Sequence, residues 1–157
     1  MKPSFLIVGT IILLAICSPA AEQGMLINKE TVRNAIGVFR QDPISQRGRA
    51  AGEVVRLFAE KSTDVILTIT PKLAPYLADV KIPQEDRSLL LAAYVIGNVD
   101  SQLLRNEKKD DPYAGVQEVI ETYRQMQKKA PALSLPEIES FIDLEKRGEL
   151  KQYVASP

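Results

Sequence analysis

The hydrophobic pattern of the chain is most continuous at Leu89–Val99, where nearly every residue is apolar. On a helical wheel, one face of this segment and its continuation carries Leu89, Ala92, Ala93, Ile96, Val99 and Leu103, and Leu90, Leu91 and Val95 widen that face. A helix that is apolar nearly all round normally lies in a protein core. A bilayer-spanning helix needs about 20 apolar residues, and this run is shorter. The pattern predicts a buried central helix over about residues 84–106.

Segments with a single apolar face, repeating every three to four residues, lie on both sides of this central helix. Helices are predicted over 28–41, 45–61, 111–129 and 134–147, and a further short apolar turn over 150–154. Asn28 and Asp111 suit the caps of two of them, Ser134 with Glu137 matches a capping box, and Gly148 suits a C-terminal cap. We expect an all-α fold, a compact orthogonal array of five to seven helices. One domain covers residues 21–157.

Residues 62–70 do not fit this helical pattern clearly. Their β-branched residues favour a strand, whereas Ser62 or Thr63 suits the cap of a short helix. The sequence holds no second strand-like run to pair with a strand here. We therefore favour a short helix that Pro71 kinks or ends. Residues 72–79 are expected to form another helical turn, with Leu73, Tyr76 and Leu77 facing inward.

Gly97 interrupts the central helix and lowers its stability by about 1 kcal/mol relative to alanine. This loss of helix stability is offset where the missing side chain lets a neighbouring backbone pack very close. We expect another helix to pack against Gly97.

The first 20 residues have the three parts of a secretory signal peptide. A positive start at Met1-Lys2 precedes the apolar run Phe5–Cys17, and Ser18 and Ala20 place small residues before a cut after Ala20. An uncleaved membrane anchor and lipid attachment at Cys17 are the alternatives. The run is short for a span, and bulky Ile16 precedes Cys17. We expect an exported, periplasmic or secreted protein without stable membrane insertion after cleavage.

The composition narrows the possible chemistry. The chain contains no histidine, and its one cysteine is Cys17, so His-based catalysis, a Cys nucleophile and ordinary zinc ligation have no residues to use. Without residues 1–20 the chain carries 19 basic and 20 acidic residues, which gives no field to attract nucleic acid. We expect no cofactor, no metal, no nucleic-acid partner and no enzymatic activity. A carboxylate-dependent hydrolase is the enzyme alternative.

One polar stripe follows the predicted central helix. Its members are Tyr94, Asn98, Gln102 and Arg105, at spacings i, i+4, i+8 and i+11, and Ser101 flanks them. Buried polar groups need partners, so the stripe either reaches the surface or bonds to a neighbouring segment. In the first case it forms a small groove for a peptide or polar ligand, and in the second it is a structural edge of a core helix. These five residues are the candidate partner-binding site.

A second charged set, on the helix predicted over 45–61, contains Arg47, Arg49 and Arg56 together with Glu53 and Glu60. It fits a solvated helix face with i,i+3 and i,i+4 ion pairs. The alternative is a phosphate site, but no Gly-rich loop accompanies these arginines.

From Leu89 to Tyr153 the order of segments is an apolar helix with a small-residue turn, a short loop, a VxxVIxxY helix and an LPE helix. This order resembles that of small exported immunity proteins that neutralise toxins delivered between bacteria. Those proteins usually carry cysteines, which this chain lacks after residue 20. The leading hypothesis is a non-enzymatic binding protein of the cell envelope or secreted space, with a protein or peptide as partner. The alternative is an immunity- or inhibitor-type protein that covers a partner's site.

Overall fold

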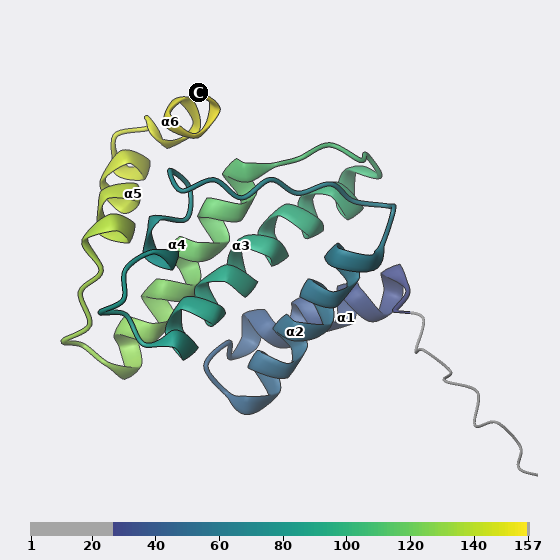
Figure 1. Cartoon of the computed structure of the whole chain (residues 1–157), viewed down its shortest axis with the longest axis horizontal. Coiled ribbons are helices and arrows are strands. Elements are labelled where there is room, and N and C mark those ends of the chain that lie inside the picture. Colours follow the sequence, from purple (N-terminus) through teal and green to yellow (C-terminus); the bar gives the residue numbers. More distant parts are fainter. Residues whose placement is uncertain (1–26, 157) are drawn as a thin grey trace, which may run out of the picture.

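The structure is a computed structural model that describes residues 27–156, and the predicted signal peptide lies outside them. The described chain folds into six α-helices and one 3₁₀ helix, η1, at Pro75–Leu77 (Figure 1). The α-helices are α1 (Lys29–Gln41), α2 (Gln46–Lys61), α3 (Gln84–Arg105), α4 (Pro112–Lys129), α5 (Pro136–Lys146) and α6 (Leu150–Ala155). No strand forms within residues 27–156. The predicted compact all-α fold is confirmed.

Helix α3 is the centre of the molecule, as its apolar pattern predicts. Most of its residues from Leu89 to Leu103 are buried. Helix α4 packs along one side of it, and the α1–α2 hairpin packs along another (Figure 1). Helices α5 and α6 cover α4 and complete the array. The amphipathic faces of the outer helices therefore share one core with α3.

The closest approach in this core is between α3 and α4, at two glycines. A Cβ atom on Gly97 would lie 2.2 Å from the carbonyl oxygen of Ala114. On α4, a Cβ on Gly115 would lie 2.9 Å from ring atoms of Tyr94. The expected approach of another helix to Gly97 is confirmed. The backbone of α4 occupies the space that a side chain at Gly97 would need, and the ring of Tyr94 occupies the space that a side chain at Gly115 would need.

The helix ends follow the predicted chemistry in most places. The side chains of Asn28 and Asp111 accept hydrogen bonds from backbone N–H groups in the first turns of α1 and α4. Gly148 has φ 74°, and the chain after α5 closes with Gly148 N–H donating to Glu145 and Glu149 N–H donating to Leu144. That pair of bonds is the Schellman arrangement of a helix C-terminus.

The predicted cap at Ser134 is wrong. Helix α5 begins at Pro136 with Leu135 in the cap position, and no side chain caps it. Leu135 is buried, and its N–H donates instead to the hydroxyl of Tyr123 at 3.0 Å. Packing of Leu135 against the core therefore sets the start of α5 one residue later than the capping-box pattern suggests.

The short helix favoured for residues 62–70 is also wrong. The segment is neither helix nor strand and runs as an extended chain across α3 (Figure 1). Its β-branched residues suit this conformation, and a side chain of α3 replaces the missing strand partner. The following residues form η1, with Leu73 and Tyr76 buried as predicted and Leu77 half-buried.

Candidate functional site

The structure buries three members of the predicted polar stripe. Tyr94, Asn98 and Gln102 have almost no exposed surface, whereas Ser101 is half-buried and Arg105 is exposed. All five have hydrogen-bond partners within the chain. The stripe is thus one connected set of polar groups along α3, between the extended segment 62–70 and the loop before α4.

Gln102 holds the extended segment by both of its amide atoms. Its Nε2 donates to the carbonyl oxygen of Ile66 at 2.7 Å, and its Oε1 accepts from the N–H of Ile66 at 3.1 Å. The side-chain amide therefore pairs with Ile66 as the backbone of a neighbouring strand would. Farther along, the hydroxyl of Tyr94 donates to the carbonyl oxygen of Thr68 at 2.9 Å.

Asn98 connects this clamp to the other side of the stripe. Its Oδ1 accepts from Gln102 Nε2 at 2.7 Å and from the N–H of Asp111 at 3.2 Å. Its Nδ2 donates to Asp110 Oδ1 at 2.5 Å. A fully buried amide needs such partners to offset its lost hydration, and Asn98 has them at both ends.

Ser101 and Arg105 meet at one carboxylate. The hydroxyl of Ser101 and Nη1 of Arg105 both donate to Asp111 Oδ2, at 2.6 and 2.7 Å. The other oxygen of Asp111 accepts from Ala114 N–H at the start of α4. The stripe therefore joins three parts of the fold: α3, the extended segment and the N-terminus of α4.

Tyr94 of the stripe and its neighbour Asp111, which bonds to Ser101 and Arg105, have shifted pKa values. Burial raises the pKa of the Tyr94 phenol above its ordinary value, and the nearby charges of Asp110 and Asp111 raise it further. Partial burial acts to raise the pKa of Asp111, but the bonds from Ser101, Ala114 and Arg105 more than offset this and lower it. Tyr94 is therefore a neutral donor and Asp111 a carboxylate at neutral pH.

These contacts show what the five residues do within the fold, and their role toward a ligand stays a prediction. The buried amides of Asn98 and Gln102 direct their polar atoms at protein groups. Only Arg105 and part of Ser101 reach solvent. A partner contacting the stripe would meet its Arg105 end.

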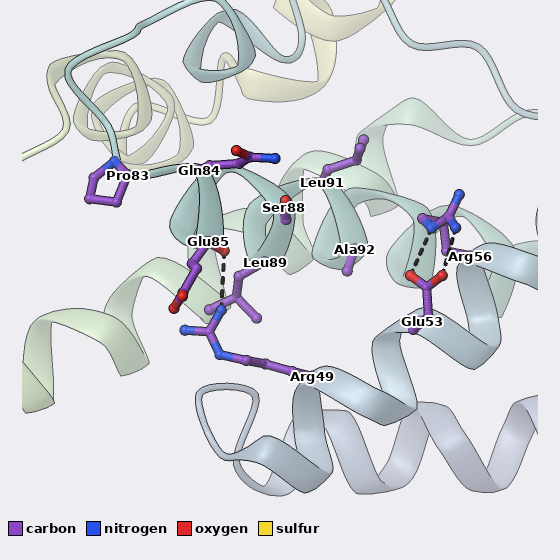
Figure 2. Close-up of a pocket in the computed structure, with 10 residues that line it drawn as sticks. All are labelled: Arg49, Glu53, Arg56, Pro83, Gln84, Glu85, Ser88, Leu89, Leu91 and Ala92. Atoms are coloured by element: carbon purple, nitrogen blue, oxygen red, sulfur yellow. Dashed lines mark hydrogen bonds and ion pairs between the residues drawn. The ribbon is translucent and has the colours of Figure 1, made fainter.

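A separate concavity lies between α2 and the first half of α3 (Figure 2). This α2–α3 groove has a volume of ≈ 990 Å³. Helix α2 lines it with Arg49, Glu53 and Arg56. Helix α3 lines it with residues that include Glu85, Ser88, Leu91 and Ala92. Leu91 and Ala92 are half-buried, so the apolar surface of α3 is left partly uncovered here. The groove has an apolar middle and a polar rim.

The two groove arginines are already bonded to protein oxygens. Arg49 donates to the carbonyl oxygens of Ile44 and Glu85, at 3.3 and 3.1 Å, and ties α2 to the start of α3 (Figure 2). Arg56 pairs with Glu53, with one N–O distance of 2.6 Å, and with Glu60. The hydrogen bond from Arg56 lowers the pKa of Glu53. This arrangement matches the ion-paired helix face expected from the sequence, with rim charges of both signs.

The α2–α3 groove was not predicted from the sequence, because Leu91 was assigned to the widened core face of the central helix. A usable signal was present. Gln84, Ser88 and Leu91 follow each other at i, i+4 and i+7 on α3, so one stripe changes from polar to apolar. Such a change indicates a helix side that leaves the core.

Within residues 27–156, no group of three or more His, Cys, Asp or Glu residues is arranged to hold a metal ion. The helices of the described chain include none that is long and apolar enough to cross a membrane.

Comparisons with protein-family models, with curated proteins and with solved structures give no match.

Proposed function

We propose that the protein is an exported, non-enzymatic binding protein that takes a segment of another protein into the α2–α3 groove. The observation that supports this most directly is the groove itself, with half-buried Leu91 and Ala92 between charged rims (Figure 2). Apolar surface left open in a concave site is typical of recognition surfaces. The absence of histidine, and the position of the single cysteine within the predicted signal peptide, also favour binding over catalysis.

An amphipathic helix of the partner fits this groove best. The groove follows α3 from Gln84 to Ala92, which corresponds to about 12 Å, or roughly two helical turns. Helix-in-groove recognition places apolar side chains at i, i+3 and i+4 against such a floor. Because the rim carries Arg49, Arg56, Glu53 and Glu85, we expect the flanks of the partner helix to carry charges of both signs.

Site-specific photocrosslinking in the producing cell tests the proposal. A photoreactive residue at Ser88, which is exposed at the groove, should give a discrete adduct with one partner protein. The same probe at Leu104, exposed and outside the groove lining, should not give that adduct.

A pair of substitutions then tests whether the groove binds. Leu91→Arg places a charge on the apolar middle and should reduce the adduct at least about tenfold, the effect of a charge buried without a partner. Leu104→Arg makes the same chemical change elsewhere on α3 and should leave the yield unchanged. Equal yields from both variants would contradict groove binding. A partner enzyme that loses activity when bound would place the protein in the inhibitor class.

Export has its own test, because it depends on residues 1–20 alone. The N-terminal sequence of the protein recovered from the periplasmic or secreted fraction should begin at Ala21. A chain that retains Met1 in the cytoplasm would contradict export without bearing on the groove.

A further inference from the structure

Three polar side chains of α4 bond to the C-terminal end of α1. Glu118 pairs with the Arg40 side chain, and Gln125 Nε2 donates to the Arg40 carbonyl oxygen at 3.3 Å. One helical turn further along α4, Lys129 Nζ lies 2.9 Å from Asp42 Oδ1. The three α4 residues follow each other at i, i+7 and i+11, so they share one face of the helix. This face of α4 therefore fixes where the end of α1 lies.

Arg40 is the centre of these contacts. Its Nε and Nη2 donate to Glu118 Oε2 at 2.9 and 2.7 Å, and its Nη1 donates to Asp100 Oδ2 at 2.8 Å. The side chains of Asp100 and Glu118 are only 14% and 12% exposed. Hydrogen bonds between charged groups are stronger than neutral ones, and carboxylates removed from water need such a partner. This Arg40 clamp, formed by Arg40, Asp100 and Glu118, joins α1, α3 and α4 at one point.

Hydrogen bonds continue from the end of α1 to the rim of the α2–α3 groove. In the turn between α1 and α2, the hydroxyl of Ser45 donates to the carbonyl oxygen of Asp42 at 2.7 Å. The carbonyl oxygen of Ile44, in the same turn, accepts from Arg49 Nε. Arg49 also donates to the carbonyl oxygen of Glu85 at the start of α3 (Figure 2). The turn thus connects the clamp to the Arg49 end of the groove.

This turn is tightly packed. A Cβ atom on Gly48, in the first turn of α2, would lie 2.9 Å from the Cα of Pro43. The hydroxyl of Ser45 caps α2 by accepting from the Gly48 N–H at 3.0 Å. The end of α1 and the first turn of α2 therefore move as one unit. A shift of α1 would also shift the wall of the groove that carries Arg49.

We infer that Arg40 is a positioning residue for the α2–α3 groove. The clamp holds the end of α1, and through the turn it holds the first half of α2 at a fixed separation from α3. Arg40 does not line the groove, so a bound partner would not touch it. A site already held in its binding conformation binds more tightly, because less ordering accompanies association. The benefit to binding rests on the proposed partner site, whereas the effect on groove geometry does not.

Distances between two spin labels test the effect on geometry. Labels at Ala50 on α2 and Ser88 on α3, both exposed positions, report the separation of the groove walls. The labelled protein carries Cys17→Ser, because Cys17 is the only native cysteine. Arg40→Gln removes the clamp and should broaden the distance distribution at least about twofold relative to the same protein with Arg40.

Two further variants complete this test. Arg124→Gln is the matched control, because it removes another arginine that pairs with two carboxylates, here on α4 and α5, and it should keep the wild-type distribution. Asp100→Asn combined with Glu118→Gln removes the clamp charges without leaving a buried carboxylate unpaired, and it should also broaden the distribution. A folded Arg40→Gln protein with the wild-type distribution would overturn the inference. If Arg40→Gln does not fold, a wild-type distribution in the double variant would overturn it.

The photocrosslinked adduct formed from Ser88 gives a second readout, which a purely stabilising role would not change. Arg40→Gln should lower the adduct yield at least about threefold at a temperature where the variant stays folded. Arg124→Gln should leave the yield unchanged. Equal yields from the wild type and Arg40→Gln would overturn the positioning role. If the wild type itself gives no adduct, the proposed partner site is contradicted, and the spin-label distances still decide whether Arg40 sets the groove geometry.

Discussion

At the scale of single residues, the polar stripe separates into buried and exposed members with very different expected energetics. Asn98 is 0% exposed and connects Gln102 to Asp110 and Asp111, whereas the Arg105 side chain is 43% exposed and makes a surface ion pair with Asp111. Removing a buried amide leaves its partners unpaired as well. Removing one exposed charge has little effect.

We therefore predict that Asn98→Ala lowers the free energy of unfolding by about 2–3 kcal/mol. Arg105→Ala, the matched control on the same stripe, should lower it by less than about 1 kcal/mol. Urea denaturation followed by far-UV circular dichroism measures both values. Similar losses for the two variants would show that the buried hydrogen bonds contribute less than their geometry indicates.

Asp111 provides a prediction about pH. Its pKa is lowered in the folded state, so its contribution to stability is present above the unfolded pKa of about 4 and is lost as pH falls through the folded value. Asp111→Asn keeps a cap acceptor for α4 and removes the charge. The variant should be less stable than the wild type at pH 7, by no more than about 1 kcal/mol. The difference should shrink as the solution is acidified below about pH 4, which urea midpoints at pH 7 and pH 3 will show.

Sequence patterns indicated which residues of the stripe belong together but not where their polar atoms point. The spacing of Tyr94, Asn98 and Gln102 fixes one side of a helix, whatever packs on it. Their partners at Ile66, Thr68 and Asp110 come from segments whose positions depend on the tertiary fold. Periodicity alone therefore left open whether the stripe binds a ligand or holds the structure.

At the scale of elements, the α3–α4 contact depends on the absence of side chains at Gly97 and Gly115. Gly97→Ala would place a methyl group 2.2 Å from the backbone oxygen of Ala114, where no flexible side chain can move aside. The two helices would have to separate along their common core. Overpacking of this kind lowers stability by about 1–3 kcal/mol, more than the roughly 1 kcal/mol gained from helix propensity.

The control for this prediction is Gly37→Ala in the middle of α1. Gly37 is exposed, and a Cβ added there meets no atom within 4 Å. Gly37→Ala should therefore raise the free energy of unfolding by about 0.5–1 kcal/mol. Thermal unfolding should show the two Gly→Ala changes acting in opposite directions. A stabilised Gly97→Ala variant would contradict the close approach.

The boundaries of the elements could be predicted where local chemistry sets them. The predictions were wrong where a distant contact sets them. Asn28, Asp111 and Gly148 act on backbone groups a few residues away, so the sequence shows their roles. The segment 62–70 takes its conformation from Gln102, about 36 residues later, which replaces a strand partner. The cap expected at Ser134 failed because burial of Leu135 determines how α5 begins.

At the scale of the whole molecule, the extended segment and the C-terminal helix are joined by one cation. Lys72 Nζ donates to the carbonyl oxygens of Tyr153 and Ser156, at 2.7 and 2.6 Å, and to the hydroxyl of Ser156 at 2.8 Å. The same ammonium lies 4.6 Å from the centre of the Tyr153 ring. A cation at the C-terminus of a helix also interacts favourably with the helix dipole. Lys72 therefore anchors α6, the last element of the fold, to the segment that crosses α3.

Because Lys72 contacts only the end of α6, we predict that removing its charge causes local opening of α6 and not unfolding of the whole molecule. Lys72→Met keeps most of the apolar stem and removes all three hydrogen bonds, so α6 should open more often than the rest of the molecule. Amide exchange of Tyr153, Val154 and Ser156 should accelerate at least about tenfold, while amides in α1 keep their wild-type rates. Lys72→Arg retains a charged donor and should recover part of the protection. A uniform increase in exchange across α1 and α6 would instead show that Lys72 stabilises the molecule as a whole.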